Sequence, residues 1–143
     1  MEFGSIPFEA TLRPAQIACR VSSVHSMHDP TEGGLINGLI EMAWASEKEI
    51  EVDLEKVFVY RESRILCQEF GVDPLGTIAS GALLLAISPS DLSPIEKAFK
   101  RNSIPFQVIG KVKRGPVRVL RIDQKSRKEL KPLPQDEILK IYG

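Results

Sequence analysis

Hydrophobic and polar residues follow two different periods along this chain of 143 residues. Apolar residues that recur at every third or fourth position predict a helix with one buried face, and alternation at every second position predicts a strand. The helical period predicts helices over residues 11–20, 33–46, 61–70 and 88–102, and a last short helix within 134–143. The period of two predicts strands over residues 23–28, 104–112 and 116–123.

Two further apolar segments complete the predicted fold. Residues 49–60 carry apolar side chains at alternate positions in two groups, which predicts two short strands or one bent strand. Residues 82–87 are continuously apolar, as in a strand that is covered on both faces. The mixed order of helices and strands predicts an α/β (α+β) fold, a layered α-β-α sandwich in which helices pack on a mixed sheet.

The helix predicted over 33–46 has an unusual beginning. Asp29 suits the N-cap position and Glu32 can complete a capping box, yet Gly33 and Gly34 follow at once. Each glycine costs about 1 kcal/mol relative to alanine inside a helix. The backbone must therefore come very close either to another element or to a ligand, and the sequence leaves both alternatives open.

A ligand at this turn would meet attractive and repulsive groups. Free N–H groups at a helix N-terminus attract anions, but the carboxylates of Asp29 and Glu32 repel a bare phosphate, so a metal-bearing or hydrogen-bonding ligand fits better. His28 ends the strand predicted over 23–28, and ligands of α/β sheets gather at strand ends. His25 and His28 alone lack the third ligand of a zinc site, so no metal site is predicted.

Charge and cysteine content exclude several classes of function. Nineteen Lys and Arg balance nineteen Asp and Glu, so nucleic acid and anionic membranes are not expected as partners. The basic segment 111–131 is interpreted as a solvated strand pair and loop, with RNA binding as the weaker alternative. Cys19 and Cys67 are predicted to be buried, inert thiols. Without a membrane-spanning run or a signal sequence, a cytoplasmic location is expected.

Three segments in a fixed order resemble one family. They are MHDPTEGGLINGLIEMA (27–43), FGVDPLGTIASGALLLAI (70–87) and IPFQVIGKV (104–112). Together they resemble the C-terminal domain of the aminoimidazole ribonucleotide (AIR) synthase-related superfamily, which includes AIR synthase, selenophosphate synthetase, thiamine monophosphate kinase and HypE. The pattern is most similar to that of the HypE-like hydrogenase expression/formation proteins.

The resemblance implies an AIR synthase-related C-terminal domain over residues 11–143, preceded by a disordered start or cloning remnant over 1–10. Members of the superfamily are two-domain, ATP-dependent enzymes that activate an amide-like oxygen or phosphorylate an acceptor. Their N-terminal domain supplies the acidic residues for Mg²⁺ and the nucleotide, and it forms a dimer. ATP and Mg²⁺ are therefore expected for the full-length protein and no cofactor for this chain alone. The implied partners are the N-terminal domain, a second copy and a maturation protein.

The same resemblance implies the residues that bind the substrate or nucleotide. These are His28, Asp29, Thr31, Glu32, Gly33, Gly34 and Asn37, with Ser80 and Gly81 in a second turn. HypE proteins usually carry Arg where this chain has Glu32, and they end in a cysteine that carries the carbamoyl group. This chain ends in Gly143 without a terminal thiol, so both departures separate it from HypE proper. No residue is assigned a catalytic role.

Two functions are consistent with these patterns. The first is the cleft-closing C-terminal domain of an ATP-dependent, HypE-type enzyme that serves hydrogenase maturation or a related activation of an amide or carbamoyl oxygen. The alternative is a stand-alone, non-catalytic dimerisation or interaction module. For the enzyme, replacement of Gly34 by Val is expected to abolish ATP turnover and to leave the fold intact.

Overall fold

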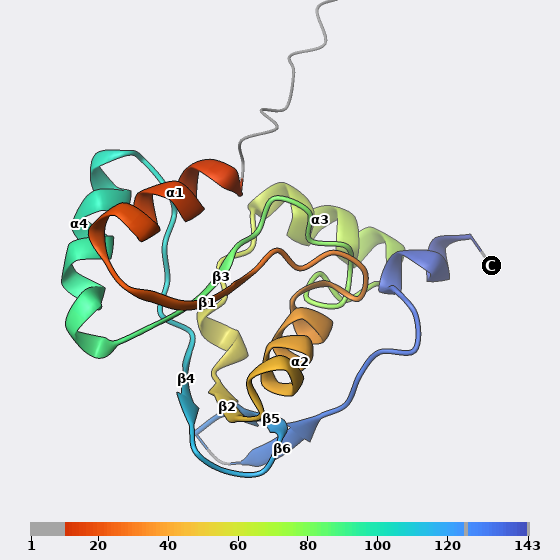
Figure 1. Ribbon diagram of the computed structural model, residues 1–143. Coiled ribbons are helices and arrows are strands. Elements are labelled where there is room, and N and C mark those ends of the chain that lie inside the picture. Colours follow the sequence, from red (N-terminus) through yellow and green to blue (C-terminus); the bar gives the residue numbers. More distant parts are fainter. Residues whose placement is uncertain (1–10, 125, 143) are drawn as a thin grey trace, which may run out of the picture. The chain divides into compact units, whose positions relative to one another are not determined.

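The computed structural model describes residues 11–124 and 126–142 and divides into two compact units. The first unit comprises the chain up to Asp29 together with Gly81–Phe106, and the second comprises Pro30–Ser80 and the chain from Gln107 onward (Figure 1). The disordered start or cloning remnant expected over residues 1–10 lies outside the described residues. Each unit has its own strands and helices and is described separately.

The first unit contains helices and a pair of strands. In chain order its elements are α1 (Leu12–Val21), β1 (Val24–His28), β3 (Leu84–Ile87), η2 (Pro89–Asp91) and α4 (Leu92–Arg101). β1 and β3 pair antiparallel, with Val24 opposite Ile87 and His28 opposite Leu84. The predictions of a helix near 11–20, a strand near 23–28 and a helix within 88–102 are confirmed.

The core of the first unit forms where α1 packs on α4. Ala18, Ile95 and Phe99 are buried there. Ile95 and Phe99 lie one helical turn apart and so share a face of α4. The ring of Phe106 meets that of Phe99 edge to face, with 5.5 Å between the ring centroids. The apolar face of α4 thus explains why this segment folds as a helix on α1.

Both cysteines are less buried than the sequence suggested. Cys19 is exposed and Cys67 is half-buried, so the prediction of buried thiols is wrong. In α1, Ala18 faces α4, and Cys19 lies about 100° further round the helix and so points away from the core. An apolar neighbourhood in sequence therefore did not place the Cys19 side chain in the core.

The second unit is built on a four-stranded mixed sheet with the strand order β4-β2-β5-β6. β2 (Glu49–Val52) pairs parallel with β5 (Arg118–Ile122) and antiparallel with β4 (Gly110–Lys113). β6 (Arg127–Leu130) pairs antiparallel with β5. The other elements are α2 (Gly34–Ser46), η1 (Leu54–Lys56), α3 (Arg61–Phe70) and η3 (Glu137–Ile141). This mixed sheet with its helices confirms the predicted α/β class.

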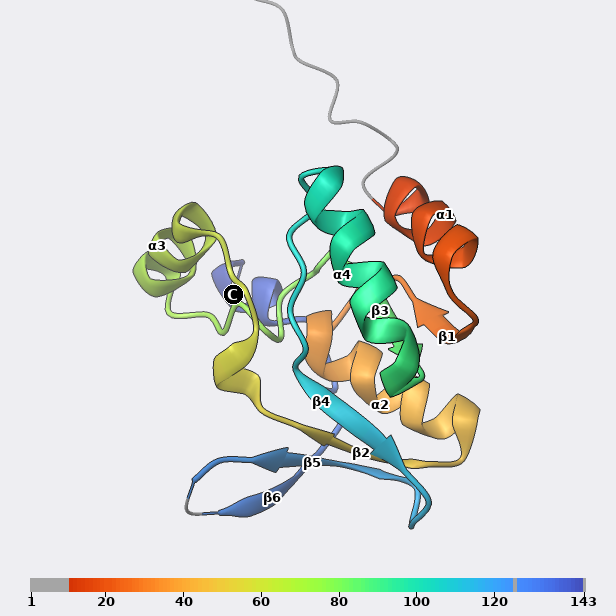
Figure 2. The ribbon, with the colours of Figure 1, turned by 90° about the vertical axis from the view of Figure 1, so that its left-hand side faces the viewer.

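The helix α2 packs on β2 and β5 and supplies most of the core of the second unit (Figure 2). Its buried residues are Gly34, Leu35, Ile36, Gly38, Leu39, Ile40, Met42 and Ala43. Glu41 is exposed, as the periodicity predicted. The sheet contributes Ile50, Val52 and Val119, each at most 5% exposed. The predicted end of α3 is also confirmed, since Gly71 follows that helix with φ 65°.

Several strand predictions differ from the structure. Residues 57–60 follow η1 without forming a strand, so β2 is what remains of the segment 49–60. The strand β6 was not predicted, because its sequence Arg-Lys-Glu-Leu is charged, as edge strands often are. The residues of β3 are half-buried rather than covered on both faces, because in the described sheet β3 pairs with a single strand.

Candidate functional site at the glycine-rich turn

The helix α2 begins later than the sequence predicted. Its first residue is Gly34 and its N-cap is Gly33, which has the left-handed φ of 73° and makes no side-chain capping bond. Gly34 is also left-handed, with φ 60°. The predicted capping box of Asp29 and Glu32 is therefore wrong, because the two left-handed residues turn the chain after Glu32 and before the helix starts. Non-glycine residues rarely adopt this backbone conformation.

Asp136 binds the beginning of α2 from a distant part of the chain. The N–H of Gly33 donates to Asp136 Oδ2 over 2.8 Å, and Asp136 is 8% exposed. The other carboxylate oxygen accepts the N–H of Ile138 over 2.9 Å, which caps η3. A buried hydrogen bond to a charged group is stronger than one between neutral groups. One carboxylate thus fixes both the glycine turn and the C-terminal helix η3.

The loop at 73–77 lies directly against Gly34. A Cβ atom at Gly34 would lie 2.7 Å from Leu75 O and 3.0 Å from Thr77 N. The N–H of Ile36 donates to Leu75 O over 3.1 Å, which joins this loop to the first turn of α2. The expectation that Gly34→Val leaves the fold intact is therefore wrong. Of the two explanations for the glycines, close approach to another element is the one that the structure supports at Gly34.

The backbone N–H groups of the turn already have partners inside the chain. Gly33 donates to Asp136, and Gly34 donates to Thr31 O over 3.1 Å. Thr31 O also accepts the N–H of Ala79 over 3.3 Å. The negative group that the N-terminus of a helix attracts is thus the protein's own carboxylate. A ligand at this turn would meet side chains rather than the amides of the two glycines.

Asn37 holds the C-terminal segment against α2. Its Oδ1 accepts the N–H of Leu133 over 2.9 Å, and its Nδ2 donates to Leu133 O over 3.3 Å. A hollow of about 230 Å³ lies beside this contact and is lined by Asn37, Ile40, Glu41, Trp44, Pro132 and Leu133. Both polar groups of the Asn37 amide are therefore engaged in positioning the chain between β6 and η3.

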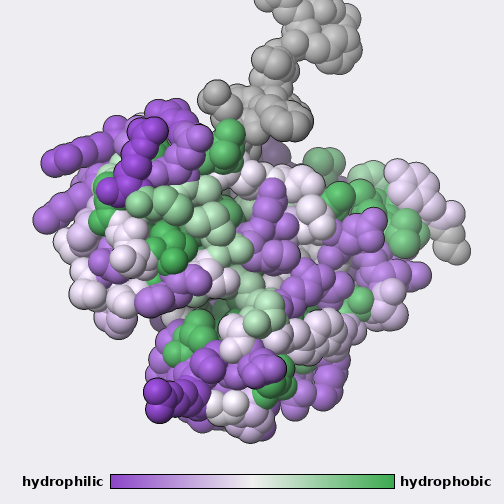
Figure 3. All heavy atoms as spheres, in the orientation of Figure 1, coloured by the Kyte–Doolittle hydropathy of each residue, from purple (hydrophilic) through white to green (hydrophobic). Residues whose placement is uncertain are grey.

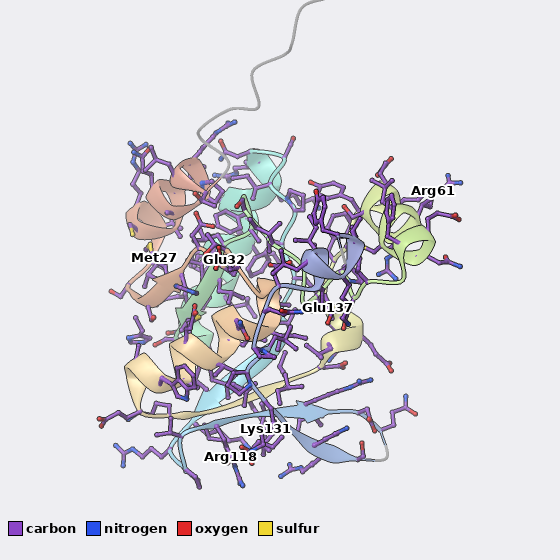
Figure 4. The ribbon with its side chains drawn as sticks, turned by 90° about the vertical axis from the view of Figure 1, so that its right-hand side faces the viewer. Met27, Glu32, Arg61, Arg118, Lys131 and Glu137 are labelled. Atoms are coloured by element: carbon purple, nitrogen blue, oxygen red, sulfur yellow. The ribbon has the colours of Figure 1, made fainter. Side chains whose placement is uncertain are left out.

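Glu137 joins the same C-terminal segment to the loop at 73–77. Its Oε2 accepts the N–H of Asp73 over 3.3 Å, and both of its carboxylate oxygens accept from Lys140 Nζ over 2.6 Å (Figure 4). The N–H of Glu137 donates to Gly76 O over 3.1 Å. The side-chain hydrogen bond from Lys140, followed by that from the Asp73 amide, lowers the pKa of Glu137. Three segments, 31–37, 73–77 and 133–140, thus form one hydrogen-bonded cluster, the glycine-turn cluster.

The predicted site residues divide between the two units. Thr31 and Glu32 are exposed at the edge of the glycine-turn cluster, and Ser80 is exposed at the end of the same unit. His28 is half-buried and Asp29 is exposed in the first unit. Gly81, also in the first unit, is exposed and has φ 97°. Within the second unit, the structure brings Gly33, Gly34 and Asn37 together.

Sequence reasoning missed Asp136 and the backbone of Leu75 and Thr77. Asp136 lies 103 positions from Gly33, and no local pattern indicates such a contact. A weak signal exists, because Asp136 directly precedes the short helix predicted within 134–143 and Asp favours the N-cap position. That signal could have identified a cap for η3, although not the bond to Gly33.

The described residues contain neither a cluster of metal-ligating side chains nor a membrane-spanning helix. Among residues 11–124 and 126–142, no group of three or more His, Cys, Asp or Glu side chains could hold a metal ion. In the same residues, no helix is long and apolar enough to cross a lipid bilayer.

The sequence matches the family model for the C-terminal domain of AIR synthase related proteins over residues 7–123. The chain belongs to this family. A hydrogenase expression/formation protein of Methanocaldococcus jannaschii is 34% identical over 68 residues, which are 48% of this chain and 20% of that protein. The carbamoyl dehydratase HypE of Rhizobium leguminosarum bv. viciae is 30% identical over 88 residues, 62% of this chain and 25% of that protein.

Solved structures of HypE share the fold of this family member. E. coli HypE, a hydrogenase maturation protein, superposes with a TM-score of 0.75 at 22% identity, over 90% of this chain and 42% of that chain. HypE in complex with ATP superposes with a TM-score of 0.74 at 23% identity, over 90% of this chain and 41% of that chain. A chain of a HypE–HypF complex superposes with a TM-score of 0.65 at 20% identity, over 77% of this chain and 37% of that chain. The chain thus spans less than half the length of these relatives, and its resemblance to HypE-like AIR synthase-related proteins is confirmed.

Proposed function

We propose that this chain is the cleft-closing C-terminal domain of an ATP-dependent enzyme of HypE type. It would act in the cytoplasm in hydrogenase maturation, or in a related activation of an amide or carbamoyl oxygen. The observation that carries the proposal is the glycine-turn cluster, a rigid turn in the segment that resembles the family's cleft motif. The HypE relative and the HypE structure with bound ATP support the same class of chemistry.

The geometry assigns different tasks to the residues of the cleft motif. Gly33 and Gly34 shape the turn, since their amides bind Asp136 and Thr31 O. The exposed side chains of Thr31 and Glu32 are then the groups of this turn that can reach a ligand. Such groups act by orienting the substrate and by placing hydrogen bonds at developing charge. His28, Asp29, Ser80 and Gly81 are further proposed ligand contacts of the full-length enzyme.

The proposal assigns the cofactors and partners mainly to the rest of the enzyme. ATP would lie between this domain and an N-terminal domain, and the acidic residues of that domain would hold Mg²⁺. A second copy of the full-length protein and a maturation protein are the other proposed partners. The solved HypE–HypF complex supports a maturation partner for a relative of this chain.

The chain of residues 1–143 alone is expected to bind ATP weakly or not at all. The glycine amides already have partners within the chain, and the described residues offer no cage for a magnesium ion. Isothermal titration calorimetry with magnesium ATP would measure this directly, with the longer two-domain protein as the positive control. A micromolar Kd for the 143-residue chain would contradict the assignment of the nucleotide site to two domains.

A second candidate, the non-catalytic interaction module, is favoured by exposed apolar side chains in the second unit. Figure 3 shows hydrophobic side chains on the surface in the region of α3 and η3. In the same unit, Phe58, Tyr60, Leu66 and Phe70 are each more than half exposed. Such patches often mark protein interfaces. The reading frame upstream of this chain separates the two candidates, because an in-frame acidic, glycine-rich domain supports the enzyme and its absence supports the module.

A further inference from the structure

A buried carboxylate lies at the centre of the four-stranded sheet. Glu51 is on β2 and is 4% exposed. Lys113 Nζ lies 2.6 Å and Lys111 Nζ 3.3 Å from its Oε2 atom. Successive side chains of a strand point to opposite faces, so Glu51 faces away from the side on which Ile50 and Val52 are buried. Both lysines come from the neighbouring strand β4.

A third cation approaches the same carboxylate from β6. Arg127 Nη2 lies 3.3 Å from Glu51 Oε1. That oxygen has no hydrogen-bond donor aligned on it within the described part of the chain. The side-chain hydrogen bond from Lys113 is the main cause that lowers the pKa of Glu51, and the hydrogen bond from Lys111 lowers it further. Burial acts in the opposite direction but does not outweigh these bonds. Glu51 is therefore negative at neutral pH, and Arg127 is the least firmly held of its three cations.

Among the ion pairs of the described residues, the three cations share the single carboxylate of Glu51, which leaves a surplus of two positive charges. The neighbouring carboxylates are already paired one to one, Glu49 with Arg118 over 2.8 Å and Glu129 with Lys131 over 2.6 Å. The stems of long cationic side chains can cover a buried group while their charged heads remain in water. The side chains of Lys111 and Arg127 are 66% and 64% exposed. Their charged groups are therefore accessible to an external anion.

We propose that this face of the β4-β2-β5-β6 sheet, with Lys111, Lys113 and Arg127 around Glu51, docks an acidic polypeptide segment of a partner protein. The inference is independent of the ATP-dependent function, because none of these residues belongs to the glycine-turn cluster. A segment with two or more carboxylates matches the two surplus positive charges. Arg127 can bind one carboxylate through two parallel hydrogen bonds, and Lys111 can bind another as a point charge.

The composition of the sheet favours a polypeptide over a nucleic acid. The four strands contain no aromatic residue, so bases have no side chains on which to stack. Glu49, Glu51 and Glu129 also lie among the cations, where they would repel a continuous phosphate backbone. The net charge of the whole chain is zero. A short acidic segment can place its few carboxylates only where the surplus cations are.

Fluorescence anisotropy with labelled hexaglutamate tests this proposal, with hexauridylate as the nucleic-acid probe. The chain is expected to bind hexaglutamate at 50 mM NaCl and to lose affinity at 300 mM, because salt screens such contacts. The double substitution Lys111→Gln with Arg127→Gln is expected to weaken binding about tenfold. It leaves Lys113 on Glu51, so the buried carboxylate stays paired. Lys97→Gln with Lys100→Gln on α4 is the control with the same change of charge.

Each result decides the proposal. The proposal is supported if the Lys111→Gln, Arg127→Gln variant (the sheet variant) loses affinity and the α4 control does not. Circular dichroism must show that both variants are folded. Equal affinities of the two variants would overturn it, because binding would then follow net charge alone. Tighter binding of hexauridylate would replace the acidic partner with a nucleic acid. No saturable binding of hexaglutamate at millimolar concentration would leave the cations with a purely structural role.

Discussion

Replacement of Gly34 by Ala is expected to lower the free energy of unfolding of the second unit by about 3 kcal/mol, from backbone strain and overpacking together. The added Cβ would lie 2.7 Å from Leu75 O and 3.0 Å from Thr77 N, both atoms of the backbone. Leu75 O cannot move away without breaking its hydrogen bond from the N–H of Ile36. Urea denaturation followed by the fluorescence of Trp44 measures the change, because Trp44 is the chain's only tryptophan and lies in this unit.

Gly71 provides the matched control for that substitution. It has nearly the same left-handed φ, 65° against 60°, but an added Cβ would meet no atom within 4 Å. Gly71→Ala is therefore expected to cost only about 1 kcal/mol, the strain of the left-handed conformation. Equal losses for Gly34→Ala and Gly71→Ala would mean that close approach to the loop at 73–77 is not what requires glycine at position 34.

Replacement of Asp136 by Ala is expected to lower the free energy of unfolding by a similar amount, about 3 kcal/mol. The substitution removes the cap of η3 and leaves the N–H of Gly33 buried without its acceptor. The same urea denaturation measures the loss. Asp136→Asn keeps one side-chain oxygen as an acceptor and should lose less stability than Asp136→Ala.

Asp53 is the control for the capping part of that effect. Its Oδ1 accepts the N–H of Glu55 over 3.1 Å and caps η1, as Asp136 caps η3. Within the described residues, Asp53 holds no distant backbone amide comparable to Gly33, and its Oδ2 forms only an exposed ion pair with Lys56 over 3.4 Å. Asp53→Ala is therefore expected to cost about 1 kcal/mol. If Asp53→Ala and Asp136→Ala were equally destabilising, the bond from Asp136 to Gly33 would contribute nothing to the stability of the turn.

The sequence predicted those parts of the fold in which local pattern and tertiary packing agree. In the helix predicted over 33–46 the apolar residues are buried and Glu41 is exposed, because a helix against a sheet keeps the period of 3.6 that the sequence shows. The same holds for α4, where Ile95 and Phe99 recur one turn apart. Strands were predicted less well, because the charged edge strand β6 carries almost no apolar signal.

The candidate site was predictable in its composition but not in its internal contacts. Two adjacent glycines at the start of an apolar helix indicated close approach of the backbone, and a left-handed turn is what the structure has. What approaches was not predictable, because Leu75 and Asp136 come from distant parts of the sequence. The predicted N-cap at Asp29 was wrong for the same reason. The distant carboxylate of Asp136 accepts the N–H of Gly33, so the turn is held by a long-range bond rather than by a local cap.

Glu32 stands where the resemblance implies an arginine in HypE proteins. The turn is held by Asp136 from within, so the exposed residue at position 32 is free to vary without loss of the turn's shape. A carboxylate there favours a cationic, metal-bearing or hydrogen-bonding group of the substrate, whereas an arginine favours phosphate. For the proposed enzyme, the substrate is therefore expected to differ from that of HypE in the part that would contact this residue.

The rate of ATP hydrolysis by the proposed full-length, two-domain protein tests the central proposal, that the segment from His28 to Gly34 borders the nucleotide and substrate. His28→Ala is the decisive variant, and His25→Ala is its control on the same strand. His25 lies within 2.9 Å of Ser88 Oγ and is not a predicted ligand contact. We expect His28→Ala to lower kcat about a hundredfold, as loss of a positioning contact does, and His25→Ala to leave it unchanged. Equal turnover in both variants would contradict the account.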